Sequence, residues 1–126
     1  MLNGSEVYAV FPAKDAERLK KFFAEKLGLT PTKEEMGMAF YESGGSKFFI
    51  YPTEFAGTNQ ATAACFDVAD VRAVVDELKG KGVTFEHYDM PGLTDNDGVH
   101  VMEGTPVKSA WFKDTEGNII SLTQYK

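Results

Sequence analysis

The sequence is poor in the residues that build metal and disulfide sites. It contains one cysteine, Cys65, and two histidines, His87 and His100, among 126 residues. A single cysteine excludes an intrachain disulfide and any zinc or iron–sulfur site made of several cysteines. Neither histidine has a second metal-binding residue at the spacing of a known ligand motif, so no metal motif can be read from the chain alone.

Basic charge and long hydrophobic runs are also lacking. Lys and Arg number 13 against 19 Asp and Glu, which gives a net charge of -6. Nucleic acids and anionic membranes require a basic face, so neither is an expected partner. No run approaches the roughly 18 apolar residues of a membrane helix, and the first residues lack the pattern of a secretory signal. We therefore expect a cytoplasmic protein whose ligand, if charge selects it, is neutral or cationic.

What is present is the composition of one ordinary globular domain. Hydrophobic residues make up 43% of the chain and charged residues 25%, proportions typical of soluble domains. A length of 126 residues supports one sizeable core and is too short for two independent ones.

The first half has the pattern strand, helix, hairpin. Residues 6–11 are rich in β-formers. From Asp15 the apolar residues recur at helical spacing until Gly28. Residues 38–42 and 47–51 flank a Ser-Gly-Gly-Ser turn and predict a hairpin.

The second half repeats this order. It predicts a strand at 61–66, a helix with an apolar stripe from Val68 to Leu78, a strand at 83–88, and a closing hairpin of 108–113 and 118–124. Residues 89–107, with two prolines and several glycines, predict a long loop.

An internal repeat connects the halves. Asp15 and Asp70 each open a helix, and Gly28 and Gly82 follow at similar distances. The repeat predicts a first module at about 6–54 and a second at about 61–126 of a single domain. One helix cannot cover both faces of a module's strands, so we expect the modules to share a sheet surface.

The closing segment, Ala110-Trp-Phe-Lys-Asp-Thr-Glu-Gly-Asn-Ile-Ile-Ser-Leu, resembles the last hairpin of the vicinal-oxygen-chelate superfamily. That group includes glyoxalase I, extradiol dioxygenases, and fosfomycin- and bleomycin-resistance proteins. Residues 15–29 resemble its first helix and Val68-Ala-Asp-Val the start of its second. The resemblance implies an α+β fold of two βαβββ modules, with an open, curved mixed sheet or half-barrel, helices outside and a cavity inside.

Within that fold, strand alternation sorts side chains between the cavity and the helices. Phe11, Tyr41, Phe48, Ile50, Phe66, Phe112, Ile120 and Leu122 are predicted to face the helices. The cavity set is Tyr8, Val10, Phe40, Phe49, Tyr51, Ala63, Cys65, Ser109, Trp111, Ser121 and Thr123. From it we take Tyr8, Phe40, Phe49, Tyr51, Cys65, Trp111 and Ser121 as candidate ligand-binding residues. The alternative is that both sets are simply core.

The resemblance also locates the superfamily's four metal-ligand positions, and they carry the wrong residues. The positions are Tyr8, Phe49, Ala63 and Ser121. Phe49 and Ala63 have no donor atom, Tyr8 would have to ionise from a pKa of about 10, and a lone serine binds metals weakly. We therefore expect no metal and no other cofactor.

The remaining reactive residues allow weaker alternatives. His87 and His100 are structural histidines or form acid–base pairs with Glu86 and Glu103. Cys65 is a small buried residue or a nucleophile in the cavity. The segment Asp95-Asn-Asp-Gly lacks most calcium ligands and predicts a turn.

Three functions remain. The first is a metal-independent protein of the bleomycin-resistance type that binds a small hydrophobic or aromatic molecule. The second is a glyoxalase- or dioxygenase-like enzyme with an atypical site that uses Tyr8, Cys65, His87 or Ser121. The third is a dimeric interaction module without a small-molecule ligand. A homodimer is expected because an open aromatic sheet face is costly to leave in water.

Overall fold

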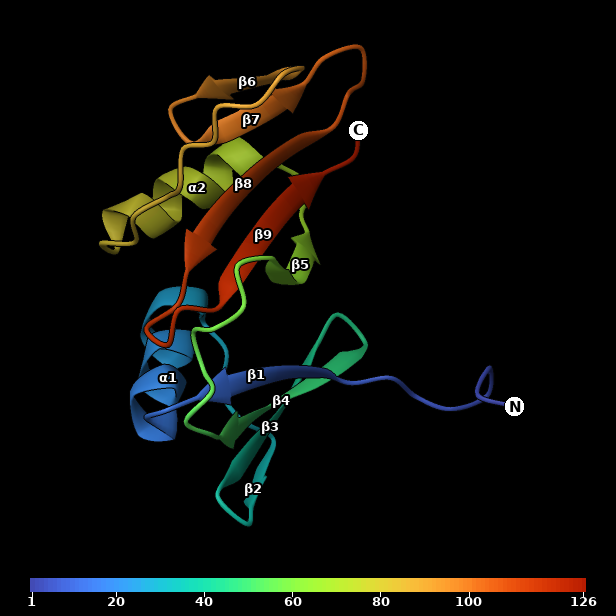
Figure 1. Cartoon of the computed structure of the whole chain (residues 1–126), viewed down its shortest axis with the longest axis vertical. Coiled ribbons are helices and arrows are strands. Elements are labelled where there is room, and N and C mark those ends of the chain that lie inside the picture. Colours follow the sequence, from blue (N-terminus) through green and yellow to red (C-terminus); the bar gives the residue numbers. More distant parts are fainter.

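A computed structural model describes residues 1–126 as two sheets and two main helices (Figure 1). The first half contains β1 Ala9–Ala13, α1 Ala16–Phe22 with its π-helical continuation η1 Phe23–Leu27, β2 Lys33–Glu35, β3 Met38–Ser43 and β4 Ser46–Pro52. The second half contains β5 Thr62–Asp67, α2 Val71–Gly80, β6 Leu93–Asn96, β7 Val99–Met102, β8 Lys108–Lys113 and β9 Ile119–Gln124. No helix has the length and apolarity needed to cross a membrane.

Strand order is the same in both halves. The sheets run β1-β4-β3-β2 and β5-β9-β8-β7-β6. In each, the first strand pairs in parallel with the last, and the last pairs antiparallel with the strand before it. The α+β fold of open mixed sheets is thus confirmed, with β6 as an addition to the second half.

Both helices begin where the sequence predicts. The Asp15 carboxylate accepts the Arg18 N–H at 3.0 Å, and the Asp70 carboxylate accepts the Ala73 N–H at 3.1 Å. Each aspartate satisfies an amide that the first turn leaves without a partner. The π-helical turn ends at Gly28, whose φ of 71° lies in the left-handed region that favours glycine.

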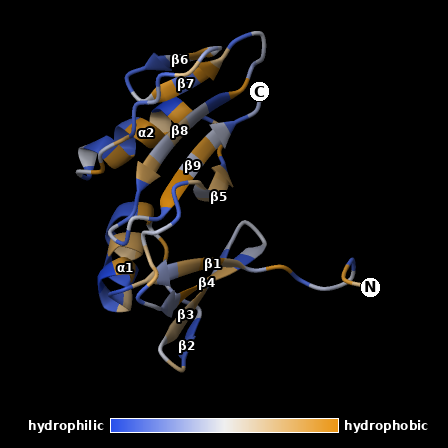
Figure 2. Ribbon diagram, viewed as in Figure 1, coloured by the Kyte–Doolittle hydropathy of each residue, from blue (hydrophilic) through white to orange (hydrophobic).

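The core lies between each sheet and its helix. Phe11 and Ile50 of the first sheet and Phe112 and Ile120 of the second are at most 1% exposed. Of the eight side chains predicted to face the helices, only Phe66 is not fully buried. Figure 2 shows hydrophobic residues running through the strands of both sheets.

A carboxylate connects the two halves. Glu116, in the turn between β8 and β9, accepts the Asp15 N–H at 2.9 Å and the Arg18 Nε–H at 2.8 Å. Asn118 donates to the Pro12 carbonyl at 3.0 Å. Burial alone would raise the pKa of Glu116, but the Arg18 guanidinium and the Asp15 amide hold that pKa below its ordinary value. The turn of one half therefore fixes the start of the helix of the other.

The segment 83–107 differs from its prediction. The strand expected at 83–88 is reduced to an isolated bridge between Phe85 and Phe112. The expected loop contains the hairpin β6–β7, closed by Asp97 and Gly98 with φ of 52° and 94°. β7 pairs with the start of β8, whereas Phe85 reaches only its end, so residues 87–92 leave the sheet before the chain rejoins it at its edge as β6.

Candidate functional site

A cleft of about 560 Å³ opens on the face of the five-stranded sheet that is turned away from α2. Trp111 and Ser109 of β8 form its floor, while Gln60, Ala61, Thr62 and Ile119 line one side. The other side consists of Tyr88, Met90, Pro91, Gly92, Leu93 and Met102. The volume lies within the range of small-molecule sites.

Trp111 is held in one orientation. Its indole Nε1–H donates to the Thr62 hydroxyl at 3.2 Å. The rings of Tyr88 and His100 contact it edge-on, with centroids at 5.3 and 5.0 Å. The indole is half-buried, so one side remains available to a ligand. Its neighbour Phe112 points to the opposite face and is fully buried, as strand alternation requires.

Residues 87–98, which include the edge strand β6, form the outer wall of the cleft. The Asp95 carboxylate joins the two ends of this wall, because it contacts His87 Nδ1 at 2.5 Å and accepts the Gly98 N–H at 2.8 Å. Burial would raise the pKa of Asp95, but the Gly98 amide and His87 lower it overall. Burial raises the pKa of the Tyr88 phenol. A charged Asp95 therefore fixes the position of this wall.

Polar side chains continue across the sheet beside the tryptophan. His100 is fully buried and its Nε2 accepts the Tyr88 N–H at 3.0 Å. Ser109 and Thr123 share a hydrogen bond of 2.9 Å, and the Cys65 thiol lies 3.3 Å from the Thr123 hydroxyl. Of this row only Ser109 lines the cleft and can meet a polar group of a ligand, and the structure brings no base next to Cys65 that would make it a nucleophile.

The seven candidate residues fall on two different sheets. Cys65, Trp111 and Ser121 share the open face of the second sheet. The other four, Tyr8, Phe40, Phe49 and Tyr51, belong to the first sheet or its edge. The cleft over Trp111 includes none of these four aromatics.

Sequence reasoning missed part of the cleft. Met90, Leu93 and Met102 were not among the candidates because residues 89–107 were expected to form a loop, and Tyr88, at the end of the strand expected at 83–88, was not assigned to the cavity. The Asp97-Gly98 pair, flanked by alternating residues, is a strong hairpin signal that would have revealed this wall.

The open face of the first sheet is aromatic and accessible. Tyr8 and Tyr51 are 39% and 38% exposed. Phe49 contacts Phe40 and Tyr8 with ring centroids at 5.3 and 6.3 Å. The Lys33 ammonium lies 4.9 Å from the centre of the Phe40 ring. Tyr8, Lys33 and Phe40 line a hollow of about 250 Å³ on this face, which Phe49 and Tyr51 do not border.

The superfamily's metal positions do not fit a metal in this chain. Tyr8 and Phe49 lie on the first sheet side and Ala63 and Ser121 on the second, and Ser121 is 4% exposed. No group of three or more His, Cys, Asp or Glu side chains is placed to hold a metal ion. His87, Asp95 and His100 come nearest, but His100 Nε2 already accepts the Tyr88 amide.

Comparison with known proteins decides the family. A sequence model of the Glyoxalase/Bleomycin resistance protein/Dioxygenase superfamily matches residues 7–122. The chain belongs to that superfamily. No curated protein sequence matches it significantly.

Several solved structures share the fold at low identity. The fosfomycin resistance protein FosX from Listeria monocytogenes is similar with a TM-score of 0.73 and 13% identity, covering 100% of this chain and 96% of that one. An integron cassette protein from V. cholerae has a TM-score of 0.66 and 21% identity, with coverage of 100% and 98%. A lactoylglutathione lyase from Agrobacterium tumefaciens has a TM-score of 0.66 and 15% identity, with coverage of 95% and 93%. At these identities the likeness shows the glyoxalase-type fold alone.

Proposed function

We propose that this protein binds a small hydrophobic or aromatic molecule, neutral or cationic, in the cleft over Trp111, without a metal. The observation that carries the proposal is the fixed indole at the floor of a cleft of about 560 Å³ with apolar walls. Aromatic faces stack on flat ligands and attract cations, each contact contributing about 0.5–2 kcal/mol. The net charge of -6 favours a cation over an anion.

The matched test uses three probes of one shape: 1-naphthylmethanol, 1-naphthylmethylammonium and 1-naphthoate. Trp111 is the only tryptophan, so its fluorescence reports binding directly. The neutral and cationic probes should quench or shift its emission and raise the melting temperature, and the anion should do so least. Absence of any response from all three would contradict the proposal, whereas native mass spectrometry of the purified protein would identify a resident ligand.

Metal independence predicts an elemental result. The positions Tyr8, Phe49, Ala63 and Ser121 supply at most two weak oxygen donors, too few for a stable site. Protein dialysed without chelator should contain far less than one zinc, iron, manganese or nickel per chain by plasma mass spectrometry. A stoichiometric metal, kept after dialysis, would overturn the metal-independent proposal.

A second copy of the chain is the proposed partner for the aromatic face of the first sheet. That face leaves Tyr8, Val10 and Tyr51 at 38–39% exposure, and a contiguous apolar surface of this kind favours association. Light scattering at tens of micromolar should give the mass of a dimer. A dimer formed through this face would bury an unpaired carboxylate in the Val10→Asp variant, so this variant should be monomeric. Lys21→Asp, on the exposed side of α1, should remain dimeric. A monomeric parent protein would contradict this interface.

A further inference from the structure

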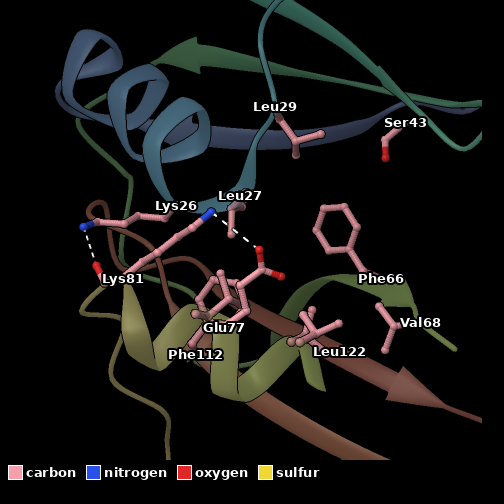
Figure 3. Close-up of a pocket in the computed structure, with 12 residues that line it drawn as sticks. Lys26, Leu27, Leu29, Ser43, Phe66, Val68, Glu77, Lys81, Phe112 and Leu122 are labelled. Carbon is pink, nitrogen blue, oxygen red and sulfur yellow. Dashed lines mark hydrogen bonds and ion pairs between the residues drawn. The ribbon is translucent and has the colours of Figure 1, made fainter. Parts of the chain in front are cut away.

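A second cavity, of about 210 Å³, lies on the other side of the five-stranded sheet, in the seam between the two halves (Figure 3). Its apolar walls come from η1 and the residues after it, from β5 and from the helix-facing side of β8 and β9. They include Leu27, Leu29, Phe66, Val68, Phe112 and Leu122. An apolar cavity of about 150 Å³ holds a benzene ring, so this one has room for a ring or a short alkyl chain.

The walls of this seam cavity are not closed by packing. Phe66, Leu27 and Leu29 contact the core but remain only partly buried. Phe66 is the one side chain predicted to face the helices that does not become fully buried, and Figure 3 shows its ring bordering the cavity. A ligand that covers this apolar surface removes it from water, which favours binding.

One end of the cavity carries an excess of positive charge. Lys26 Nζ donates to the Lys81 carbonyl at 2.5 Å, and Lys81 Nζ lies 3.9 Å from the Glu77 carboxylate (Figure 3). The cavity lining thus includes two lysines and one glutamate, on a chain whose overall charge is -6. The π-helical turn, a feature often found at functional sites, places Lys26 and Leu27 at this end.

We propose that the seam cavity binds a small organic carboxylate with an alkyl or aryl tail. The tail covers the apolar walls, and the carboxylate pairs with the Lys81 ammonium at the mouth of the cavity (Figure 3). A neutral molecule would leave the excess charge uncompensated, and an inorganic anion would leave the walls uncovered. This site does not depend on the cleft over Trp111, which lies across the sheet and favours the opposite charge.

Octanoate is the probe, with octanol as the uncharged probe of equal length. Titration is followed by carbon–proton NMR of protein with labelled Leu and Val methyl groups. Octanoate should shift the methyl signals of Leu27, Leu29 and Val68 saturably, and octanol should bind at least several-fold more weakly. Trp111 fluorescence should stay unchanged, so failure here and failure of the cleft proposal can be told apart.

Two substitutions at the mouth should act in opposite directions. Lys81→Gln should weaken octanoate binding about three- to fivefold, the range for an exposed ion pair. Glu77→Gln should strengthen it by a similar factor, which a purely structural role would not produce. Both side chains are exposed, so the fold is expected to survive. Val68→Phe, which fills the cavity, should abolish binding.

The proposal is overturned if millimolar octanoate shifts none of these methyl signals. It is also overturned if octanol binds equally well, or if Lys81→Gln and Glu77→Gln change the affinity in the same direction.

Discussion

Replacing Trp111 by alanine should weaken binding of 1-naphthylmethylammonium at least tenfold. The indole forms the floor of the cleft and is fixed by Thr62, Tyr88 and His100, and loss of a preorganised stacked aromatic of this type costs about 1.5–3 kcal/mol. Isothermal titration calorimetry measures the effect without the tryptophan signal. Trp111→Phe retains an aromatic ring, so its affinity for the probe should fall less than that of Trp111→Ala.

The fold should tolerate this change because Trp111 is half-exposed on the face away from α2. Circular dichroism of Trp111→Ala checks this. Phe55, which is 77% exposed in the connection between the halves, provides the matched aromatic control, and Phe55→Ala should bind as the parent does. Equal affinity of Trp111→Ala and the parent would place the ligand elsewhere.

Replacing Glu116 by alanine should lower the free energy of unfolding by about 2–3 kcal/mol, or the melting temperature by about 10 °C. Its side chain is fully buried, while Arg18 is 54% exposed. The substitution therefore leaves the Asp15 amide unsatisfied, while the guanidinium returns to water. Because Arg18 stays solvated, the loss should remain below that of a fully buried ion pair.

Glu17 of α1 offers the control, since its carboxylate also lies near the start of that helix but is 84% exposed beside Lys20. Glu17→Ala should change stability by no more than about 0.5 kcal/mol. Equal effects of the two substitutions in thermal and urea unfolding would show that Glu116 does not join the halves.

The pH dependence gives a second measure of Glu116. Its pKa is lower in the folded protein than the ordinary 4.5, so the stability it supplies is complete above pH 4.5 and is lost as the pH falls through the folded value. The difference in unfolding free energy between parent and Glu116→Gln should therefore shrink on acidification. A difference that is constant down to acidic pH would contradict the lowered pKa.

Local signals in the sequence predicted the elements whose ends are set locally. Asp15, Asp70 and Gly28 define helix ends through their own side chain or backbone freedom, and the structure has those ends. Strand alternation likewise separated Phe112 from Trp111 correctly. These features depend on a few neighbouring residues and not on the rest of the fold.

Local signals could not predict which of two segments, β7 or residues 83–88, pairs with the edge of β8. Residues 83–88 have the composition of a strand, but β7 occupies the part of β8 that they would need. The choice depends on pairing energies between distant segments, which composition does not contain. The relative placement of the two sheets, which separates Trp111 from Tyr8, Phe40, Phe49 and Tyr51, is likewise a long-range property.

The position of β9 has a consequence for synthesis of the chain. β5 pairs in parallel with β9, so Thr62 cannot pair until Ile119, nearly 60 residues later, has been synthesised. The turn before β9 also supplies Glu116 and Asn118 to the first half. A nascent chain that has emerged only as far as α2 thus has no partner for β5 and no carboxylate at Arg18. We expect a nascent chain carried on a C-terminal linker long enough to span the exit tunnel to gain protease resistance abruptly, once residues through Gln124 have left the tunnel.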